Sequence, residues 1–216
     1  MQILFVSSEA APFAKVGGLA DVVGSLPVAL TERGADARLI LPKYGVIPAE
    51  YTSDMEFMES FSVFVGGKEK YVGLFRLPFR GTTVYFIDNE EFFGDSIYGY
   101  GEFEAEKNVY FAYAVLASLD HLGDFKPDIL HCNDWQTALL PVLLKDASSP
   151  KTVLTVHNLK YQGQFSIDLM RHLTGLPDEF FTSEVLEFYG EANMLKAGLL
   201  HADKITTVSP QYAKET

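Results

Sequence analysis

The sequence predicts an α/β protein built on a Rossmann-like, doubly wound parallel sheet with an added β-hairpin. Short apolar runs without polar alternation recur along its 216 residues, as expected of strands that are buried on both faces. Segments with helical periodicity separate these runs, which favours parallel strands joined by helices. In the middle of the chain, glycine-containing turns separate three further apolar segments, which is typical of a hairpin and a returning strand.

The predicted parallel strands are five apolar runs, at residues 3–7, 37–41, 128–131, 152–156 and 204–208. Between the first two runs, the apolar side chains from Leu19 to Leu30 follow the spacing of one helix face. Gly34 lies where the C-terminal cap of that helix belongs. Pro27 lies inside the helix and should kink it or loosen one turn.

The hairpin is predicted at residues 57–65 and 71–78, and the returning strand at residues 83–88. Further helices are predicted at residues 104–122, 135–144 and 191–200. Ser209 and Pro210 begin another helix, and the chain stops soon afterwards at Thr216. We therefore expect residues 1–216 to be the N-terminal domain of a longer protein whose C-terminal domain is not included.

The composition is that of an ordinary soluble globular protein, because 48% of the residues are hydrophobic and 21% are charged. The net charge is −12 and the basic residues are dispersed, which argues against a nucleic-acid partner. A neutral ligand such as a sugar polymer fits this charge better. No apolar stretch approaches the roughly 20 residues of a membrane-spanning helix, and Met1 leads into a strand without a signal sequence. We expect a cytoplasmic protein with no membrane partner.

Cys132 is the sole cysteine, which excludes an intramolecular disulfide and a cysteine-based zinc cage. A single thiol in such a chain is more often a small buried hydrophobe than a nucleophile. We therefore expect Cys132 to belong to the core.

Polar, aromatic and glycine residues gather after three of the predicted strands, at residues 7–19, 131–135 and 157–163. Ligands of open α/β sheets bind beyond the carboxyl ends of the strands. The sequence therefore predicts that these three segments meet and form a binding crevice at one edge of the sheet.

Lys15, Gly17 and Gly18 directly precede the first predicted helix. Glycines at this place let a ligand approach the backbone, and the free N–H groups of the helix suit a sugar-nucleotide diphosphate. A plain glycine turn with a solvated lysine fits the pattern as well, and neither G-x-G-x-x-G nor a P-loop is present. Asp21 would interact favourably with the helix dipole, and Glu9 would contact a sugar hydroxyl or be solvated.

Four residues after the later strands are further candidates. Asp134 fits a helix N-cap, and Trp135 fits core packing or stacking on a sugar ring. His157 and Asn158 supply two hydrogen-bonding side chains directly after an apolar strand. This combination favours a binding role over a purely structural one.

Two other segments leave their roles open. Asn193 is a poor helix former near a helix end, and Lys196 is by default a solvated charge. The loop at residues 92–101, which includes Tyr98, combines aromatic rings with glycines. Its rings suit either stacking against glucose or docking onto the core.

Together these segments resemble the bacterial glycogen synthase and plant starch synthase family of GT-B glycosyltransferases. The motifs that carry the resemblance are KVGGLADVVG at 15–24, HCNDWQ at 131–136, TVHNLKYQG at 155–163, NMLKAGL at 193–199 and TVSP at 207–210. Gln136 is a departure, because many relatives have histidine there.

The resemblance implies the N-terminal, acceptor-side domain of a two-domain enzyme. Such an enzyme transfers glucose from ADP-glucose, or less often UDP-glucose, to the non-reducing end of an α-1,4-glucan such as glycogen or starch, with retention of the anomeric configuration. Neither a metal nor a further cofactor is expected. A plastid location would apply if a plant transit peptide had been removed.

The resemblance also implies roles on the donor side. Lys15 and the backbone of Gly17 and Gly18 would lie against the phosphates and glucose of the donor. Asp21 would lie close to the same donor site, as the second catalytic candidate beside His157.

His157 and Asn193 would hold glucose hydroxyls, with Asn158 at the same donor site. The backbone carbonyl of His157 would face the sugar and help an oxocarbenium-like transition state. On the acceptor side, the resemblance implies a border formed by Tyr98, Asp134 and Trp135.

In this family most nucleotide contacts lie in the second domain, so we expect residues 1–216 alone not to catalyse transfer. Two other hypotheses come from different classes. One is a stand-alone glucan-binding module, and the other is a nicotinamide-dependent oxidoreductase on a Rossmann sheet. The missing G-x-G-x-x-G argues against the oxidoreductase.

Overall fold

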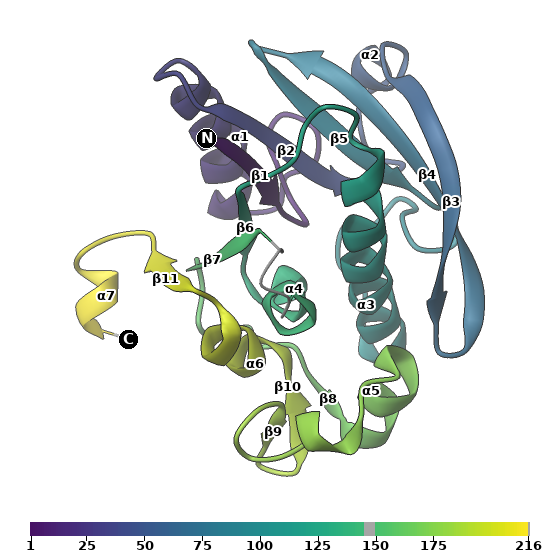
Figure 1. Ribbon diagram of the computed structural model, residues 1–216, viewed down its shortest axis with the longest axis vertical. Helices are drawn as coiled ribbons and strands as arrows, with labels where there is room; N and C mark the ends of the chain where they lie inside the picture. Colours follow the sequence, from purple (N-terminus) through teal and green to yellow (C-terminus); the bar gives the residue numbers. More distant parts are fainter. Residues whose placement is uncertain (145–149, 216) are drawn as a thin grey trace.

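The computed structural model describes residues 1–144 and 150–215 of the chain (Figure 1). The strands of its main sheet are β1 (Gln2–Val6), β2 (Asp36–Pro42), β3 (Glu56–Val65), β4 (Lys68–Phe79), β5 (Thr82–Asp88), β6 (Ile129–Asn133), β7 (Lys151–Val156) and β11 (Lys204–Thr207). They form one eight-stranded sheet in the order β11-β7-β6-β1-β2-β5-β4-β3. This arrangement confirms the predicted α/β class with a mostly parallel central sheet.

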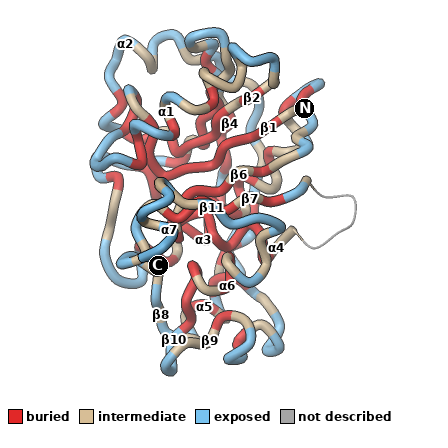
Figure 2. Tube along the Cα trace, turned by 90° about the vertical axis from the view of Figure 1, so that its left-hand side faces the viewer, coloured by how far each residue is buried: buried red, intermediate tan, exposed pale blue. Residues whose placement is uncertain are grey.

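The centre of the sheet is parallel and deeply buried, as the continuous apolar runs predict. β1 pairs in parallel with β2 on one side and with β6 on the other, so that Val6 lies beside both Ile40 and Cys132. Cys132 is fully buried, and burial raises the pKa of its thiol. Figure 2 shows the buried stretches running along these central strands. The chain leaves β1 toward β2 and later returns to β6, so the strand order reverses beside β1. Such a reversal is where open α/β sheets bind their ligands.

The helices form two layers around this sheet (Figure 1). They are α1 (Gly18–Thr31), α2 (Ala49–Thr52), α3 (Gly101–Ser118), α4 (Leu139–Leu143), α5 (Ile167–Thr174), α6 (Met194–His201) and α7 (Tyr212–Glu215), with short 3-10 turns at Leu119–His121, Trp135–Thr137 and Asp178–Phe180. α1 packs on β2 and β5, whereas α4 contacts both α3 and α6 in a separate layer. This separation of helices is the doubly wound arrangement that the alternation of strands and helices predicts.

α1 ends at a glycine, as expected. The N–H of Ala35 donates to the carbonyl of Leu30 at 3.1 Å, and the N–H of Gly34 donates to that of Thr31 at 2.9 Å. Gly34 has a φ of +89°, which is the left-handed conformation of this Schellman motif. The helix is continuous through Pro27 from Gly18 to Thr31.

The hairpin extends the main sheet at one edge. β3 and β4 are joined by Gly66 and Gly67 alone, both with positive φ, so β4 begins at Lys68 and not at the expected Tyr71. β5 pairs with β4 in the antiparallel sense and with β2 in the parallel sense. The returning strand therefore joins the hairpin to the parallel core.

Two of the predicted helices were wrong in detail. The segment at 135–144 is a 3-10 turn followed by the five-residue α4. Residues 191–193 form strand β10 (Glu191–Asn193), and α6 begins only at Met194. β10 lies between β8 (Gln164–Ser166) and β9 (Glu187–Phe188) in a small antiparallel sheet. Strands of two or three residues are too short for any periodicity to show in the sequence.

Within residues 1–144 and 150–215, every helix is too short or too polar to cross a lipid bilayer. This agrees with the absence of long apolar runs in the sequence.

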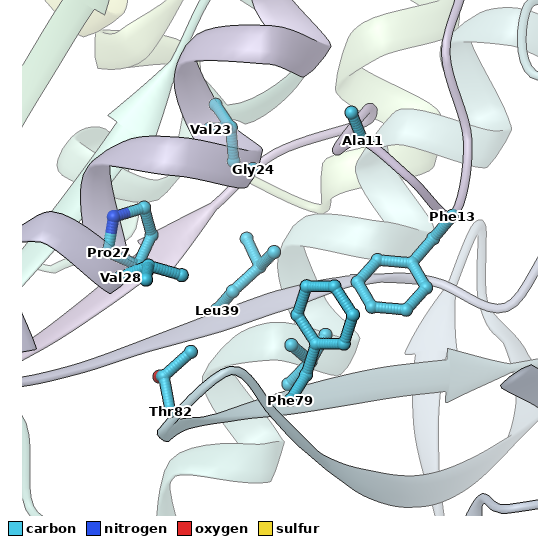
Figure 3. Close-up of a pocket in the computed structure, with 10 residues that line it drawn as sticks. Ala11, Phe13, Val23, Gly24, Pro27, Val28, Leu39, Phe79 and Thr82 are labelled. Atoms are coloured by element: carbon cyan, nitrogen blue, oxygen red, sulfur yellow. The ribbon is translucent and has the colours of Figure 1, made fainter.

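α1 packs against the loop that follows β1 through a glycine. A Cβ atom placed on Gly24 would lie 2.2 Å from the carbonyl oxygen of Ala11. Figure 3 shows Gly24 and Ala11 at the wall of a small apolar cavity, of about 10 Å³, between α1 and the sheet. This close contact fixes the distance between the helix and the loop at residues 7–17.

We predict that Gly24→Ala lowers the free energy of unfolding by about 1–3 kcal/mol, because the added methyl collides with rigid backbone. Urea denaturation measures the change. Gly18→Ala is the matched control in the same helix, because a Cβ there meets no atom within 4 Å. Equal stability of the two variants would contradict this account of how α1 is packed.

Candidate functional site

The loops that follow β1, β6 and β7 meet at the carboxyl ends of these strands. Asp134, directly after β6, accepts hydrogen bonds on Oδ1 from the backbone N–H of His157 at 2.7 Å and of Asn158 at 3.3 Å, both directly after β7. The end of β1 joins them, because the side-chain amide of Asn133 in β6 donates to the carbonyl of Val6 at 3.1 Å. The structure thus brings together the three segments that the sequence predicts to form a crevice.

Glu9 connects the first of these loops to the start of α1. Its side chain is 3% exposed, so the expectation of a solvated carboxylate is wrong. Oε2 accepts hydrogen bonds from the N–H groups of Val16 at 2.5 Å and Gly17 at 3.0 Å. Oε1 accepts a short hydrogen bond from the hydroxyl of Tyr98. The carboxylate therefore occupies backbone donors that the sequence analysis had left for a ligand.

Lys15 and Asp21 form an ion pair at the N-terminal end of α1. Lys15 Nζ lies 2.7 Å from Asp21 Oδ1 and 2.8 Å from Oδ2. Both side chains are about half exposed, so the pair itself adds little stability. Asp21 occupies the first turn of the helix as expected, and in this position it also neutralises the lysine.

Gly17 and Gly18 are not required by the packing of the chain. Gly17 is the N-cap of α1 in an extended conformation, and neither glycine has a φ in the left-handed region. A Cβ atom on either would meet no atom within 4 Å. The contrast with Gly24 and Gly163 is clear, because a Cβ there would lie 2.2 Å from another part of the chain. The two glycines at the start of α1 therefore leave backbone open to an external molecule.

Asp134 has an unusual backbone. Its φ of +56° and ψ of −174° lie in a region that residues other than glycine rarely occupy. Asp134 occupies the N-cap position of the 3-10 turn as expected, but its side chain makes no capping hydrogen bond there. It turns instead to the amides after β7, which hold it in place. Burial raises the pKa of this carboxyl to about 6, although the hydrogen bonds from His157 and Asn158 act in the opposite direction.

His157 is a neutral imidazole at pH 7, because burial lowers its pKa to about 4 even though Glu9 acts in the opposite direction. Its Nε2 lies 3.0 Å from Asn133 Oδ1. The amide nitrogen of Asn133 donates to the carbonyls of Val6 and His131, which identifies Oδ1 as the acceptor. His157 therefore carries its proton on Nε2, and Nδ1 keeps a lone pair.

Asn158 and Asn193 lie in different surroundings. The exposed Asn158 accepts the N–H of Lys160 on its Oδ1 at 3.0 Å. Asn193 is 1% exposed and caps α6, because its Oδ1 accepts the N–H of Lys196 at 2.9 Å. Its amide nitrogen donates to Gln162 at 2.6 Å. Asn193 thus has a clear structural role, and its contact with a donor stays a prediction.

Lys196 is not the solvated charge expected by default. Its Nζ donates to the backbone carbonyls of Ser183 at 2.5 Å and Glu187 at 2.6 Å. The lysine therefore ties α6 to the segment that contains β9.

Trp135 and Tyr98 differ in what they present to solvent. Trp135 is 8% exposed and packs on Gly163 and Phe165, as the core-packing interpretation holds. Its place at the acceptor border stays a prediction, and the buried indole ring has little exposed surface on which a sugar could stack. Tyr98 is partly buried, and both burial and the bond to Glu9 raise the pKa of its hydroxyl. In the same loop, Phe92 and Phe93 are docked in the core.

Sequence reasoning missed two residues of this site. Glu9 was left between contact with a sugar hydroxyl and solvation, and its structural role in the loop after the first strand was not foreseen. Asn133 was not singled out, although it is the last residue of β6. A polar residue at the carboxyl end of a buried strand is the signal that could have identified it.

Comparisons with known proteins agree with this geometry. Residues 2–216 match the family model of the starch synthase catalytic domain. The chain is 47% identical over 221 residues to glycogen synthase of Lachnospira eligens, covering 99% of this chain and 46% of that protein. It is 49% identical over 223 residues to glycogen synthase of Caldicellulosiruptor saccharolyticus, covering 100% of this chain and 46% of that protein.

A solved structure gives the same result. The catalytic domain of starch synthase IV from Arabidopsis thaliana, bound to ADP and acarbose, superimposes with a TM-score of 0.88 at 31% identity, covering 99% of this chain and 46% of that one. The chain thus spans about half the length of the relatives it matches. It belongs to the starch synthase catalytic domain family, which includes the bacterial glycogen synthases.

Proposed function

We propose that this chain forms one side of the active site of a retaining glucosyltransferase that extends an α-1,4-glucan. The donor is ADP-glucose or UDP-glucose, and a second domain supplies the other side of the cleft. The observation that carries the proposal is the open glycine pair at the start of α1. It lies at the end of the loop that Glu9 ties to Tyr98, and Glu9 also acts on Asp134 and His157. The ADP and acarbose of the Arabidopsis relative support a nucleotide and a glucan as ligands.

The backbone at Gly17 and Gly18 is open to close approach by a phosphate or a glucose ring of the donor, with the N–H of Gly17 already bonded to Glu9. A ligand there needs close approach to the main chain, which a side chain at either position would prevent. Lys15 lies beside this backbone and brings a positive charge that Asp21 now pairs. On donor binding, Lys15 exchanges this exposed partner for the diphosphate at little cost.

His157 and Asp134 suit a sugar ring that gains positive charge. The neutral imidazole can accept a hydrogen bond from a sugar hydroxyl on Nδ1. Because the ring carries no positive charge, it does not repel a sugar that becomes cationic. Asp134 accepts the N–H of Asn158, which belongs to the same peptide group as the His157 carbonyl. A carboxylate on that N–H draws electron density toward the carbonyl oxygen, because hydrogen bonds in series polarise one another. This oxygen is then a better partner for an oxocarbenium-like transition state.

The proposal needs no metal or cofactor beyond the nucleotide sugar itself. Tyr98, Asp134 and Trp135 border the acceptor, and Asn158 and Asn193 complete the donor side. The glucan end approaches along the rim formed by the loops after β5 and β6.

The first test is glucose transfer by the protein expressed from its full reading frame. We expect radiolabelled glucose to pass from ADP-glucose or UDP-glucose to maltooligosaccharides, and His157→Ala to lower kcat/KM by roughly 100-fold. His121→Ala is the control, because His121 stacks on Phe61 away from the site. Full activity of His157→Ala, or no transfer by the wild type from either donor, would refute the proposal.

Gly18→Ala tests the glycine pair separately from the fold. We expect unchanged or slightly higher stability, because alanine favours the helix by up to about 1 kcal/mol. We also expect kcat/KM to fall by roughly 100-fold, because the added methyl moves the donor by about an ångström. Thermal unfolding and the transfer assay measure the two effects. Wild-type activity in this variant would show that nothing approaches the backbone at Gly18.

Asp134→Asn tests the buried carboxylate through pH. The native pKa of about 6 lies above the ordinary aspartate value of 3.8, so the folded protein holds the proton more tightly and loses stability as the pH rises from about 4 to about 6. Asparagine keeps the acceptor oxygen without the charge. We expect equal stability near pH 4 and a variant more stable by on the order of 2 kcal/mol at pH 7. Urea denaturation at both pH values measures the free energy of unfolding of the two proteins. A stability difference between them that does not change with pH would contradict the raised pKa.

A further inference from the structure

A buried ion pair in α3 holds the loop that carries Tyr98. Glu104 and Lys107 lie one helical turn apart, 2.7 Å between Oε2 and Nζ, and their side chains are 7% and 3% exposed. The pair has no part in the contacts described so far. Its further hydrogen bonds go to the backbone of the loop that precedes α3.

Both members of the pair bind the backbone on either side of Tyr98. Lys107 Nζ donates to the carbonyl of Ile97 at 2.8 Å. Glu104 Oε2 accepts the N–H of Gly99 at 2.6 Å. A Cβ on Gly99 would lie 2.8 Å from the same Oε2, so the close approach depends on glycine. The ion pair therefore fixes the peptide groups that flank Tyr98.

A buried ion pair is not by itself evidence of a stabilising role. Removing two charges from water costs several kcal/mol per ion, and apolar side chains of similar volume are often as good or better. What apolar side chains cannot supply is the two directed hydrogen bonds to the loop. The remaining oxygen, Oε1, accepts from the amide of Asn108 at 3.0 Å, so the carboxylate is fully engaged.

The contacts continue from this loop to the start of α1. The Tyr98 hydroxyl donates to Glu9, and the other oxygen of Glu9 accepts the N–H groups of Val16 and Gly17. A displacement of Tyr98 would leave Glu9 buried with one partner fewer. The carboxylate could recover a partner only by moving, and such a movement would change its hydrogen bonds to the backbone at residues 16 and 17.

We propose that Glu104 and Lys107 are positioning residues of the donor site, which act through Tyr98 and Glu9 on the backbone of Val16 and Gly17. The proposal rests on the proposed function for the identity of the donor. Both side chains are buried, so the proposed action on the donor is indirect.

Lys107→Met in the full-length protein is the test, with two readouts. We expect amide hydrogen exchange in a peptide spanning residues 14–19 to rise about tenfold, the factor for the loss of one hydrogen bond. We expect the KM for ADP-glucose to rise by a similar factor, with a smaller change in kcat. The exchange readout does not need activity. An inactive wild type with faster exchange in the variant would refute the proposed function and leave the positioning role intact.

Lys70→Met is the matched control. Lys70 is a 9% exposed lysine that pairs with Glu91 at 2.5 Å and with Glu106 of α3 at 3.4 Å. It also lies over the Phe92 ring at 5.0 Å, so it contacts the start of the loop and not the peptide groups that flank Tyr98. We expect it to lose stability as Lys107→Met does, without faster exchange at residues 14–19 and without a higher KM.

The double variant Glu104→Leu/Lys107→Met separates positioning from stability. It removes both charges together, so it should recover part of the stability lost in Lys107→Met while the exchange rate and the KM stay raised. Two results would overturn the proposal. One is a wild-type exchange rate at residues 14–19 in Lys107→Met or in the double variant. The other is a KM that falls back to the wild-type value in the double variant as its stability recovers.

Discussion

The site depends on the burial of one carboxylate. Glu9 is almost fully removed from water, and a charge in that position needs several hydrogen bonds to be tolerated. It takes them from two backbone amides at the start of α1 and from the Tyr98 hydroxyl. The loop after β1, the helix that follows it and the loop before α3 are thereby fixed relative to one another. Their geometry at the crevice follows from satisfying this single group.

Asp134 likewise fixes two loops relative to each other, those that follow β6 and β7. Its side chain fixes the chain after β7, while the N–H of Asp134 donates to Thr155 at 2.9 Å. The positive φ at Asp134 stores strain, and these contacts hold it. Two short loops from neighbouring strands thus become one rigid unit. A site assembled in this way does not need long loops, because the sheet already places the strand ends side by side.

The fold was largely predictable because its core obeys one rule along the whole chain. The runs at residues 3–7, 37–41 and 152–156 correspond to β1, β2 and β7, since strands buried on both faces must be continuously apolar. The small sheet of β8, β9 and β10 has no such signal. Asn193 shows the difficulty, because the same residue ends a strand and caps a helix. Its side chain can cap α6 only because the backbone changes from strand to helix at this residue, and the sequence does not show where that change occurs.

At the site, the sequence could indicate which loops meet but not how their polar atoms are paired. His157 and Asp134 were identified from their positions after strands, and the structure places them in direct contact. The burial of Glu9 was not predictable, because it depends on Tyr98 from a loop 89 residues away. The same holds for Gly17 and Gly18. A Cβ atom on either would meet no atom within 4 Å, whereas one on Gly24 would collide with Ala11, and this difference depends on tertiary packing.

The pairing of charges at the crevice has a consequence for the direction of catalysis. Glu9 and Asp134 raise the negative potential of the rim, His157 adds no positive charge, and Asp21 cancels Lys15. Under the proposed function, these carboxylates would stabilise a glucose ring that gains positive charge at its anomeric carbon. The phosphates of the donor would instead meet Lys15, once Asp21 no longer pairs with it. The charges of the chain would thus separate the place of the ring from the place of the phosphates along one wall of the cleft.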